Sequence, residues 1–310
     1  MGTVSLLSRV EKTQRNKFNL LMGTVSLLSR SRTTGHRALG HPRLAMMGAV
    51  SVLSRSRTAI AFAAALAACG TTGGDLVSFD VTASGPATAA GPGFAIDNGL
   101  GWHIALDKAQ LHIGAIYLNL SVPSSGAQLT NCILPGVYTA QELAGLTVDV
   151  LSAAPQRFPA PGNGTTDLPR AAELWLTGGD INASTDTTVI ADLAGTASRG
   201  AAAIPFTARI TIGANRLIPP SDPALPSAHP ICKQRIVSPI LLDNVRLSDG
   251  GTLRLRIDPA AWFANVDFTG VAPGAALPDD LTTPASQNLF SGLRSAGGTY
   301  AFTFDERTPP

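Results

Sequence analysis

The thiol of Cys69 is the group in this sequence whose surroundings most clearly specify a chemistry. Two basic residues, Arg55 and Arg57, come first, and an unbroken apolar run of ten residues, Ala59–Ala68, leads directly to the cysteine. Such a run fits the apolar part of a secretory signal, and it is about half of the roughly 20 residues that a membrane-spanning helix needs. We therefore predict a segment that directs export and is then removed.

The residues Leu66-Ala-Ala-Cys69 resemble the lipobox of bacterial lipoproteins. The resemblance implies cleavage before Cys69, diacylation of its thiol with palmitate-type chains and acylation of its new amino group. Gly70 stands where an aspartate typically marks retention in the inner membrane, so the resemblance implies a lipid anchor in the outer membrane of a bacterial envelope. The alternative is an ordinary signal peptide with an incidental cysteine.

The start of the chain repeats one nine-residue segment, as Met1–Arg9, Met22–Arg30 and, slightly altered, Met47–Arg55. Copies this short and unevenly spaced do not form a repeat fold. We interpret residues 1–54 as an extension that is either disordered or the product of a mis-assigned start codon, with the true start at Met46 or Met47.

The remaining chain divides into a lipoprotein signal peptide (55–68), the lipidated cysteine with a short tether (69–75) and a single domain (76–310). Removal of residues 1–68 takes away ten of the 23 Lys and Arg but only one of the 21 Asp and Glu, which leaves a formal net charge of −7. This balance argues against nucleic acid as a partner. All four methionines also lie in the removed part, which excludes a methionine-rich copper site.

Two further cysteines, Cys132 and Cys232, remain in the exported chain. In an oxidising compartment they predict one disulfide, which would stabilise the domain by about 4–5 kcal/mol for a loop of about 100 residues. The alternative is a pair of metal-binding thiolates or a reactive cysteine.

The candidate metal ligands are three histidines, His103, His112 and His229. His103 and His112 have opposite parity on their predicted strands, so we expect them to face opposite sides and not to converge on a metal. The segment Asp180–Asp186 has oxygen-bearing side chains at alternate positions, as a calcium loop does, but it lacks the glycine and the glutamate of that pattern. We predict no metal and no cofactor; the alternative is a zinc or copper site built from His103, His112 or His229 with a free cysteine.

The sequence contains no Gly-x-Ser-x-Gly, no His-Glu-x-x-His and no phosphate-binding glycine loop, so we do not expect an enzyme. Aromatic side chains either line a ligand pocket or, as is more common, form the core; these are Trp102, Trp175, Trp262, Phe263 and Phe268.

Many short strand signals separated by turn residues predict an all-β fold, an antiparallel β-sandwich (Ig-like or jelly-roll-like) with a few short helices. The clearest hairpin joins Val189–Ala197 to Ile204–Ile212. The run Gln110–Val122 reads as one strand, and Asp107-Lys108 before it reads either as a hairpin turn or as a bulge in a longer strand. Helices are predicted at Thr139–Glu142, from a capping-box spacing, at Ala260–Phe263 and at Pro284–Leu293.

The Gly101-Trp102-x-x-x-Leu106 segment resembles a hairpin in uncharacterised bacterial envelope lipoproteins, and loose apolar patterns extend the likeness to Phe268. Some members carry histidines before the Pro-Gly-x-Tyr step, whereas this chain has Thr130-Asn-Cys132 there, so no metal role follows. We expect a membrane-anchored, non-catalytic binding or structural module, whose partners are the membrane and a protein or small ligand. The alternative is a periplasmic protein that handles a metal or a small ligand.

Overall fold

The computed structural model describes residues 74–122, 136–214 and 230–307, which all belong to one compact unit, Ala67–Pro310. Cys69, Cys132 and His229 lie outside the described residues. Within these ranges, no helix is long and apolar enough to span a membrane.

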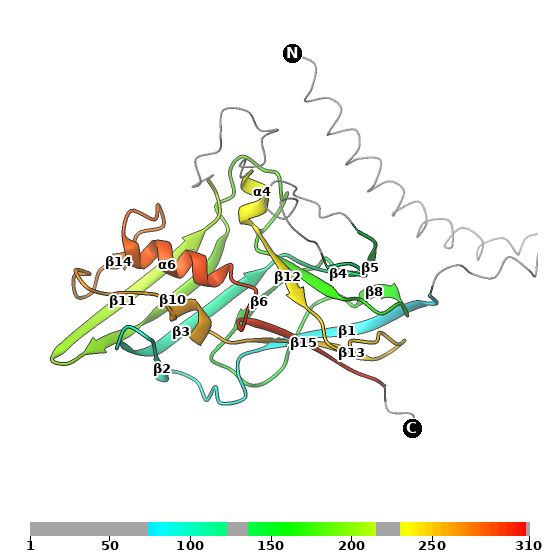
Figure 1. Cartoon of the computed structure of the whole chain (residues 1–310), viewed down its shortest axis with the longest axis horizontal. Helices are drawn as coiled ribbons and strands as arrows, with labels where there is room; N and C mark the ends of the chain where they lie inside the picture. The colour runs from blue at the N-terminus through cyan, green and yellow to red at the C-terminus, as the bar shows by residue number, and fades with distance from the viewer. Residues whose placement is uncertain (1–73, 123–135, 215–229, 308–310) are drawn as a thin grey trace, which may run out of the picture. The chain divides into compact units, whose positions relative to one another are not determined.

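The described residues form two packed β-sheets (Figure 1). The larger sheet contains, in spatial order, β12 (Ile236–Leu241), β9 (Ala171–Trp175), β4 (Ala115–Asn119), β5 (Tyr138–Glu142), β8 (Gly162–Thr165), β1 (Leu76–Ser84), β13 (Thr252–Ile257) and β15 (Tyr300–Asp305), with β7 (Gln156–Arg157) also paired with β1. The second sheet contains β14 (Ala276–Leu277), β11 (Ala202–Thr211), β10 (Val189–Arg199), β3 (His103–Ile113) and β2 (Phe94–Asp97), with β6 (Leu146–Asp149) also paired with β3.

The predicted β-sandwich is therefore confirmed. The described strand pairs are antiparallel except for β1 with β13 and β11 with β14, which are parallel. The predicted hairpin is β10–β11, in which Arg199 pairs with Ala202 across the turn at Gly200.

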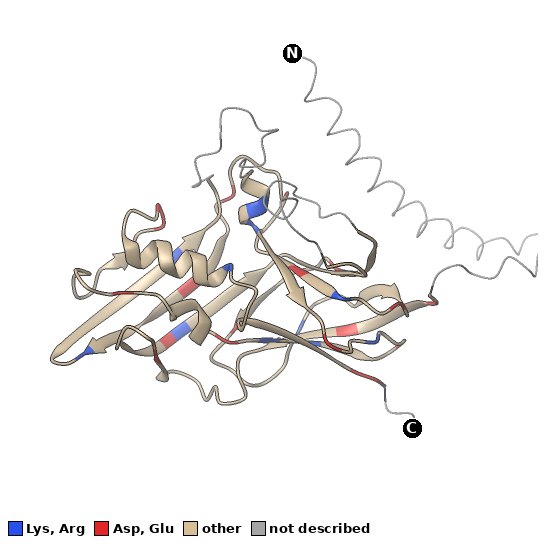
Figure 2. Ribbon diagram, viewed as in Figure 1, with Lys and Arg blue, Asp and Glu red and all other residues tan. Residues whose placement is uncertain are grey.

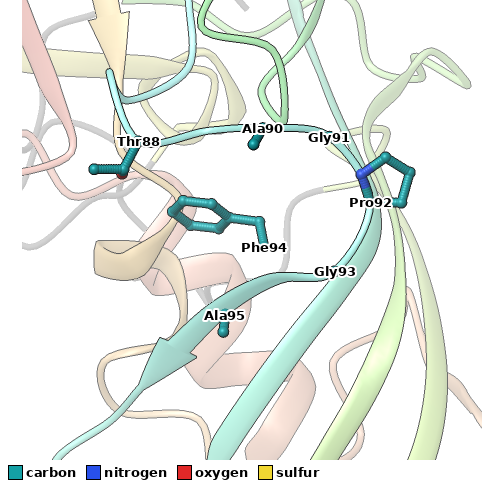
Figure 3. A pocket seen from close by; sticks show the side chains of 7 residues that line it. All are labelled: Thr88, Ala90, Gly91, Pro92, Gly93, Phe94 and Ala95. Atoms are coloured by element: carbon teal, nitrogen blue, oxygen red, sulfur yellow. The ribbon is translucent and has the colours of Figure 1, made fainter.

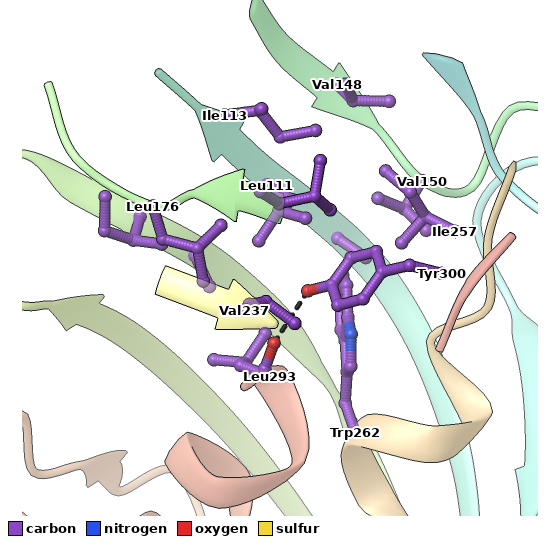
Figure 4. Close-up of a cluster of buried hydrophobic side chains, with 14 of the residues drawn as sticks. Leu111, Ile113, Val148, Val150, Leu176, Val237, Ile257, Trp262, Leu293 and Tyr300 are labelled. Atoms are coloured by element: carbon purple, nitrogen blue, oxygen red, sulfur yellow. Dashed lines mark hydrogen bonds between the residues drawn. The ribbon is translucent and has the colours of Figure 1, made fainter. Parts of the chain in front are cut away.

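The main core lies between the two sheets, because most strands alternate core-facing apolar residues with outward-facing polar ones. Figure 4 shows side chains from β3 and β6 packed against residues of β12 and β13. Within this core, Tyr300 donates a hydrogen bond of 2.7 Å to the carbonyl oxygen of Leu293, and burial raises the pKa of the Tyr300 phenol.

β3 is one continuous strand with a bulge, which settles the alternative left open at Asp107-Lys108. Leu106 pairs with Gly195 and Lys108 pairs with Ala194, so Asp107 is the extra residue. The core-facing side chains therefore change parity along the strand, from Ile104 and Leu106 before the bulge to Ala109, Leu111 and Ile113 after it.

The chain passes from the second sheet to the larger one at Gly114, between β3 and β4. The predicted strand Gln110–Val122 is therefore wrong as a single element. A Cβ atom at Gly114 would overlap the carbonyl oxygen of Thr177, so the close approach of the two backbones requires glycine here.

Three short helices complete the described structure: α4 (Ile231–Gln234), α5 (Ala260–Phe263) and α6 (Pro284–Leu293). The predictions of α5 and α6 are confirmed. The predicted helix at Thr139–Glu142 is wrong, because this segment lies in β5 and pairs with β4 and β8. Pairing on two sides outweighs the local capping signal.

Thr283 caps the N-terminus of α6, since its Oγ1 accepts a hydrogen bond of 3.2 Å from the backbone N–H of Ser286. We expect Thr283→Ala to lower the free energy of unfolding by about 1 kcal/mol, because one amide of the first turn loses its acceptor. Urea unfolding would measure this loss. The neighbouring exposed residue provides the control, since Thr282→Ala is expected to change stability by less than about 0.5 kcal/mol; equal effects would contradict the capping role.

Candidate functional site

Of the three cysteines singled out from the sequence, only Cys232 lies in the described structure. It is part of α4 and is 2% exposed, and it packs in a small apolar cluster with Ala115, Trp175, Ile181 and Ile236. Its pairing with Cys132 stays a prediction.

The two described histidines project from the same outer face of the second sheet, so the expectation of opposite faces is wrong. The bulge at Asp107 reverses the parity on which that expectation depended. The residues are nonetheless far apart, because nine residues of strand span roughly 30 Å.

Each of these histidines has its own local partner. His103 Nδ1 lies 2.8 Å from Asp97 Oδ1, and His112 Nδ1 lies 3.0 Å from Thr147 Oγ1. Burial lowers the pKa of His112, against the opposing influence of Asp186. In residues 74–122, 136–214 and 230–307, no three His, Cys, Asp or Glu side chains are grouped so that they could hold a metal.

The calcium-like segment forms a hydrogen-bonded turn. Asp180 Oδ1 accepts a bond of 3.0 Å from the backbone of Asn182. The two carboxylate oxygens of Asp186 accept bonds of 2.9 Å from the backbone of Thr188 and 2.8 Å from Thr177 Oγ1. These carboxylates therefore organise the turn itself.

Four of the five candidate aromatic residues lie in the main core and do not line a pocket. Trp102, Trp262, Phe263 and Phe268 are each at most 2% exposed, and the rings of Trp102 and Phe268 meet edge to face at 5.6 Å. A shallow surface hollow of about 340 Å³ lies instead at the loop Thr88–Ala95 (Figure 3). Glycine, proline and alanine make up most of its wall, so it offers few side chains that could form hydrogen bonds with a ligand.

The larger sheet carries a second buried layer on its outer face, and this layer is the candidate functional site. All five residues of β9 are buried, so both faces of this strand are covered. The outer face combines Glu173 and Trp175 of β9 with Tyr117 of β4 and Tyr138 of β5. The ring of Tyr117 lies 4.6 Å from that of Trp175 and 5.7 Å from that of Tyr138.

Glu173 is the acidic centre of this site and is 1% exposed. Tyr138 Oη donates a hydrogen bond of 2.9 Å to Glu173 Oε1, and Trp175 Nε1 donates one of 3.3 Å to Oε2. Burial raises the pKa of Glu173, while these two donors and the charge of Lys233 act in the opposite direction.

Lys233 of α4 is the basic centre and is 8% exposed. Its Nζ is buried and has no hydrogen-bond partner among the described residues. Burial lowers the pKa of Lys233 to about 8, with Glu173 opposing the shift and Arg294 adding to it. Arg294 donates a hydrogen bond of 3.1 Å to the backbone oxygen of Lys233.

The site thus combines a buried carboxylate, an amine with an unused donor and a row of aromatic rings. Groups of this kind bind small polar ligands by hydrogen bonding and stacking, although here the carboxylate and the amine are both buried. The sequence offered one signal for it, because Glu173 is the single charged residue in the apolar run Ala171–Leu176. Nothing in the sequence marked Lys233.

The low pKa of Lys233 predicts a specific pH dependence of stability. Because its folded pKa lies below its value of 10.5 in the unfolded chain, the unfolded state holds more protons between pH 8 and 10.5. The contribution of Lys233 to stability therefore rises with pH in this window. We expect wild type to gain about 0.5–1 kcal/mol relative to Lys233→Met between pH 8 and 9 in urea unfolding. Parallel pH profiles for the two proteins would contradict the prediction.

Comparison of this chain with protein-family models, with curated proteins and with solved structures finds no match.

Proposed function

We propose that the chain is a lipid-anchored protein of a bacterial envelope, attached to the outer membrane through Cys69, and that its β-sandwich is a non-catalytic binding or structural module. The observation that carries the proposal is the position of the first described strand. β1 starts at Leu76, seven positions after Cys69, and it is an interior strand of the larger sheet. A lipid on Cys69 would therefore hold the whole sandwich close to the membrane surface.

Small-ligand handling is the second candidate function, and the Lys233 site supports it. Its buried amine has an unused hydrogen-bond donor and interacts electrostatically with Glu173, whose carboxylate accepts hydrogen bonds from Tyr138 and Trp175. The separation of His103 and His112 gives no support to the metal-binding form of this alternative.

The anchor is tested by Cys69→Ala in the full chain. We expect wild type in the membrane fraction, labelled by radioactive palmitate, and the variant unlabelled and released from the membrane. Gly70→Ala is the matched control, since it leaves the thiol in place and is expected to behave as wild type. Unlabelled wild-type protein, or a variant that stays in the membrane fraction, would overturn the anchor.

A further inference from the structure

Large exposed hydrophobic side chains gather at one end of the larger sheet. Seven such residues occur in the described ranges, and five of them share this end. We call these five the apolar rim: Leu76 (59% exposed), Val122 (43%), Val137 (60%), Leu168 (38%) and Leu241 (70%). The other two, Leu100 and Leu143, lie elsewhere.

Strand register places the rim residues at the same end. Leu76 begins β1 opposite Thr165, the last residue of β8, and Leu168 follows in the connection to β9. Asn119 pairs with both Tyr138 and Ala171, so the segments that contain Val122, Val137 and Leu168 adjoin this end.

Leu241 completes the rim, because it ends β12 opposite Ala171. The strands from β12 to β1 occupy six adjacent positions in the sheet, so the rim extends over roughly 24 Å. Figure 1 shows that β1 begins at the right-hand end of the sheet, beside β5 and β8. Leu143 follows the opposite end of β5.

The predicted lipid attachment point is joined to this same end by the chain that leads into β1. Covalent geometry limits the seven residue steps from Cys69 to Leu76 to roughly 25 Å. A lipid on Cys69 would thus bring the rim within reach of the bilayer, whereas the end of the sheet that carries Leu143 would point away from it.

The charges around the rim indicate which kind of contact it makes. Figure 2 shows acidic and basic residues together at this end of the larger sheet. The exposed charged residues there are Asp75, Arg170, Asp243, Arg246, Asp249, Asp305, Glu306 and Arg307. Because acidic residues outnumber basic ones, this end is not attracted to anionic lipids, and burial of apolar side chains is the main source of affinity.

We propose that the apolar rim inserts into the interfacial layer of the phospholipid bilayer and fixes the orientation of the sandwich on the membrane. The proposal rests on the lipid anchor at Cys69. Single exposed leucines are common on protein surfaces, but five large apolar residues at one end, beside the anchor, fit a membrane-facing edge. In this orientation the opposite end of the larger sheet, where Leu143 lies, faces the aqueous phase.

Tryptophan reporters test the orientation in the full chain, purified from membranes and reconstituted in phosphatidylcholine vesicles. Leu241→Trp places a reporter in the rim, and Leu143→Trp is the matched control at the opposite end. The three native tryptophans are at most 8% exposed and give a constant background. With lipids brominated near the headgroup, we expect about twofold quenching of the rim reporter and little change for the control reporter, because the interfacial layer is only about 5–10 Å deep.

Quenching of the rim reporter that is unchanged when anionic lipid is added supports the proposal. Quenching of both reporters, of neither, or only with anionic lipid would overturn it. If the protein forms a dimer that shields the rim reporter from bromine, the rim is an interface with a second copy of the chain. This outcome would also overturn the proposal. The mass of the Cys69 peptide from the same preparation distinguishes failure of the lipid anchor from failure of the rim contact. An unlipidated peptide refutes the anchor and, with it, the inference. A lipidated peptide without quenching of the rim reporter refutes the rim contact alone.

Discussion

Replacement of Arg235 by methionine is expected to lower the free energy of unfolding by about 3 kcal/mol. Arg235 is fully buried between α4 and β12. Its Nε donates a hydrogen bond of 2.9 Å to the backbone oxygen of Ile212, and its Nη1 donates bonds of 3.2 Å and 2.9 Å to those of Asp180 and Ile181. Methionine would leave these three carbonyls without their donor and disconnect the end of β11 from the larger sheet.

Two lysine substitutions separate the geometry of this contact from its charge. Arg235→Lys keeps the charge but loses the planar guanidinium group, whose Nε and Nη1 donate to carbonyl oxygens in different directions. We therefore expect a loss of unfolding free energy nearly as large as that of Arg235→Met. Arg209→Lys is the control, because Arg209 is an exposed residue of β11, and a change within about 0.5 kcal/mol is expected. Urea unfolding of the variants supplies the values. Arg235→Lys with wild-type stability would show that charge alone suffices.

Much of the fold follows from alternation in the sequence. Thr252–Ile257 reads as a strand because Leu253, Leu255 and Ile257 share parity, and these three residues face the core. The helix after Asp258-Pro259 forms as its local signals predict but begins one residue later, at Ala260, with Pro259 at the N-cap position; Asp258 Oδ1 accepts a hydrogen bond of 2.9 Å from the backbone N–H of Ala260. Signals of this kind act within a few residues, so the sequence alone discloses them.

The errors arise where distant segments decide the structure. The bulge at Asp107 depends on the register of β3 against β10, which no local pattern encodes, and it moves His112 to the face occupied by His103. Thr139–Glu142 has a helical capping pattern but forms a strand because β4 and β8 pair with it on either side. In both cases, contacts between residues far apart in the chain outweigh local preference.

The candidate site was difficult to foresee for the same reason. Glu173 and Lys233 are sixty positions apart, and they meet because α4 lies against the outer face of β9. An acidic residue in an apolar strand signals a buried partner, but only the fold identifies Lys233 as that partner.

Replacement of Glu173 by glutamine is expected to destabilise the domain by about 2 kcal/mol at pH 7. The amide has one acceptor, so it can receive a hydrogen bond from Tyr138 but then presents its N–H₂ group to Trp175 Nε1, which is also a donor. Loss of the carboxylate also removes the charge that favours protonated Lys233. Only the protonated amine is stabilised by this charge. Because the pKa of Lys233 is about 8, protonation of Lys233 at pH 7 stabilises the folded protein by at most about 1.4 kcal/mol. The second contribution therefore cannot exceed this value.

The two contributions differ in their pH dependence, which allows them to be measured separately. Above pH 8 Lys233 is already mostly neutral in the folded protein, so the destabilisation caused by Glu173→Gln should fall by about 1 kcal/mol between pH 7 and 9. In the Lys233→Met background, the same substitution should cost a similar amount at both pH values, since only the donor mismatch with Trp175 remains. Urea unfolding of the four proteins at the two pH values completes the cycle. A destabilisation by Glu173→Gln that is independent of pH in both backgrounds would show that the charges of Glu173 and Lys233 are not coupled, and the site would then be held by its hydrogen bonds alone.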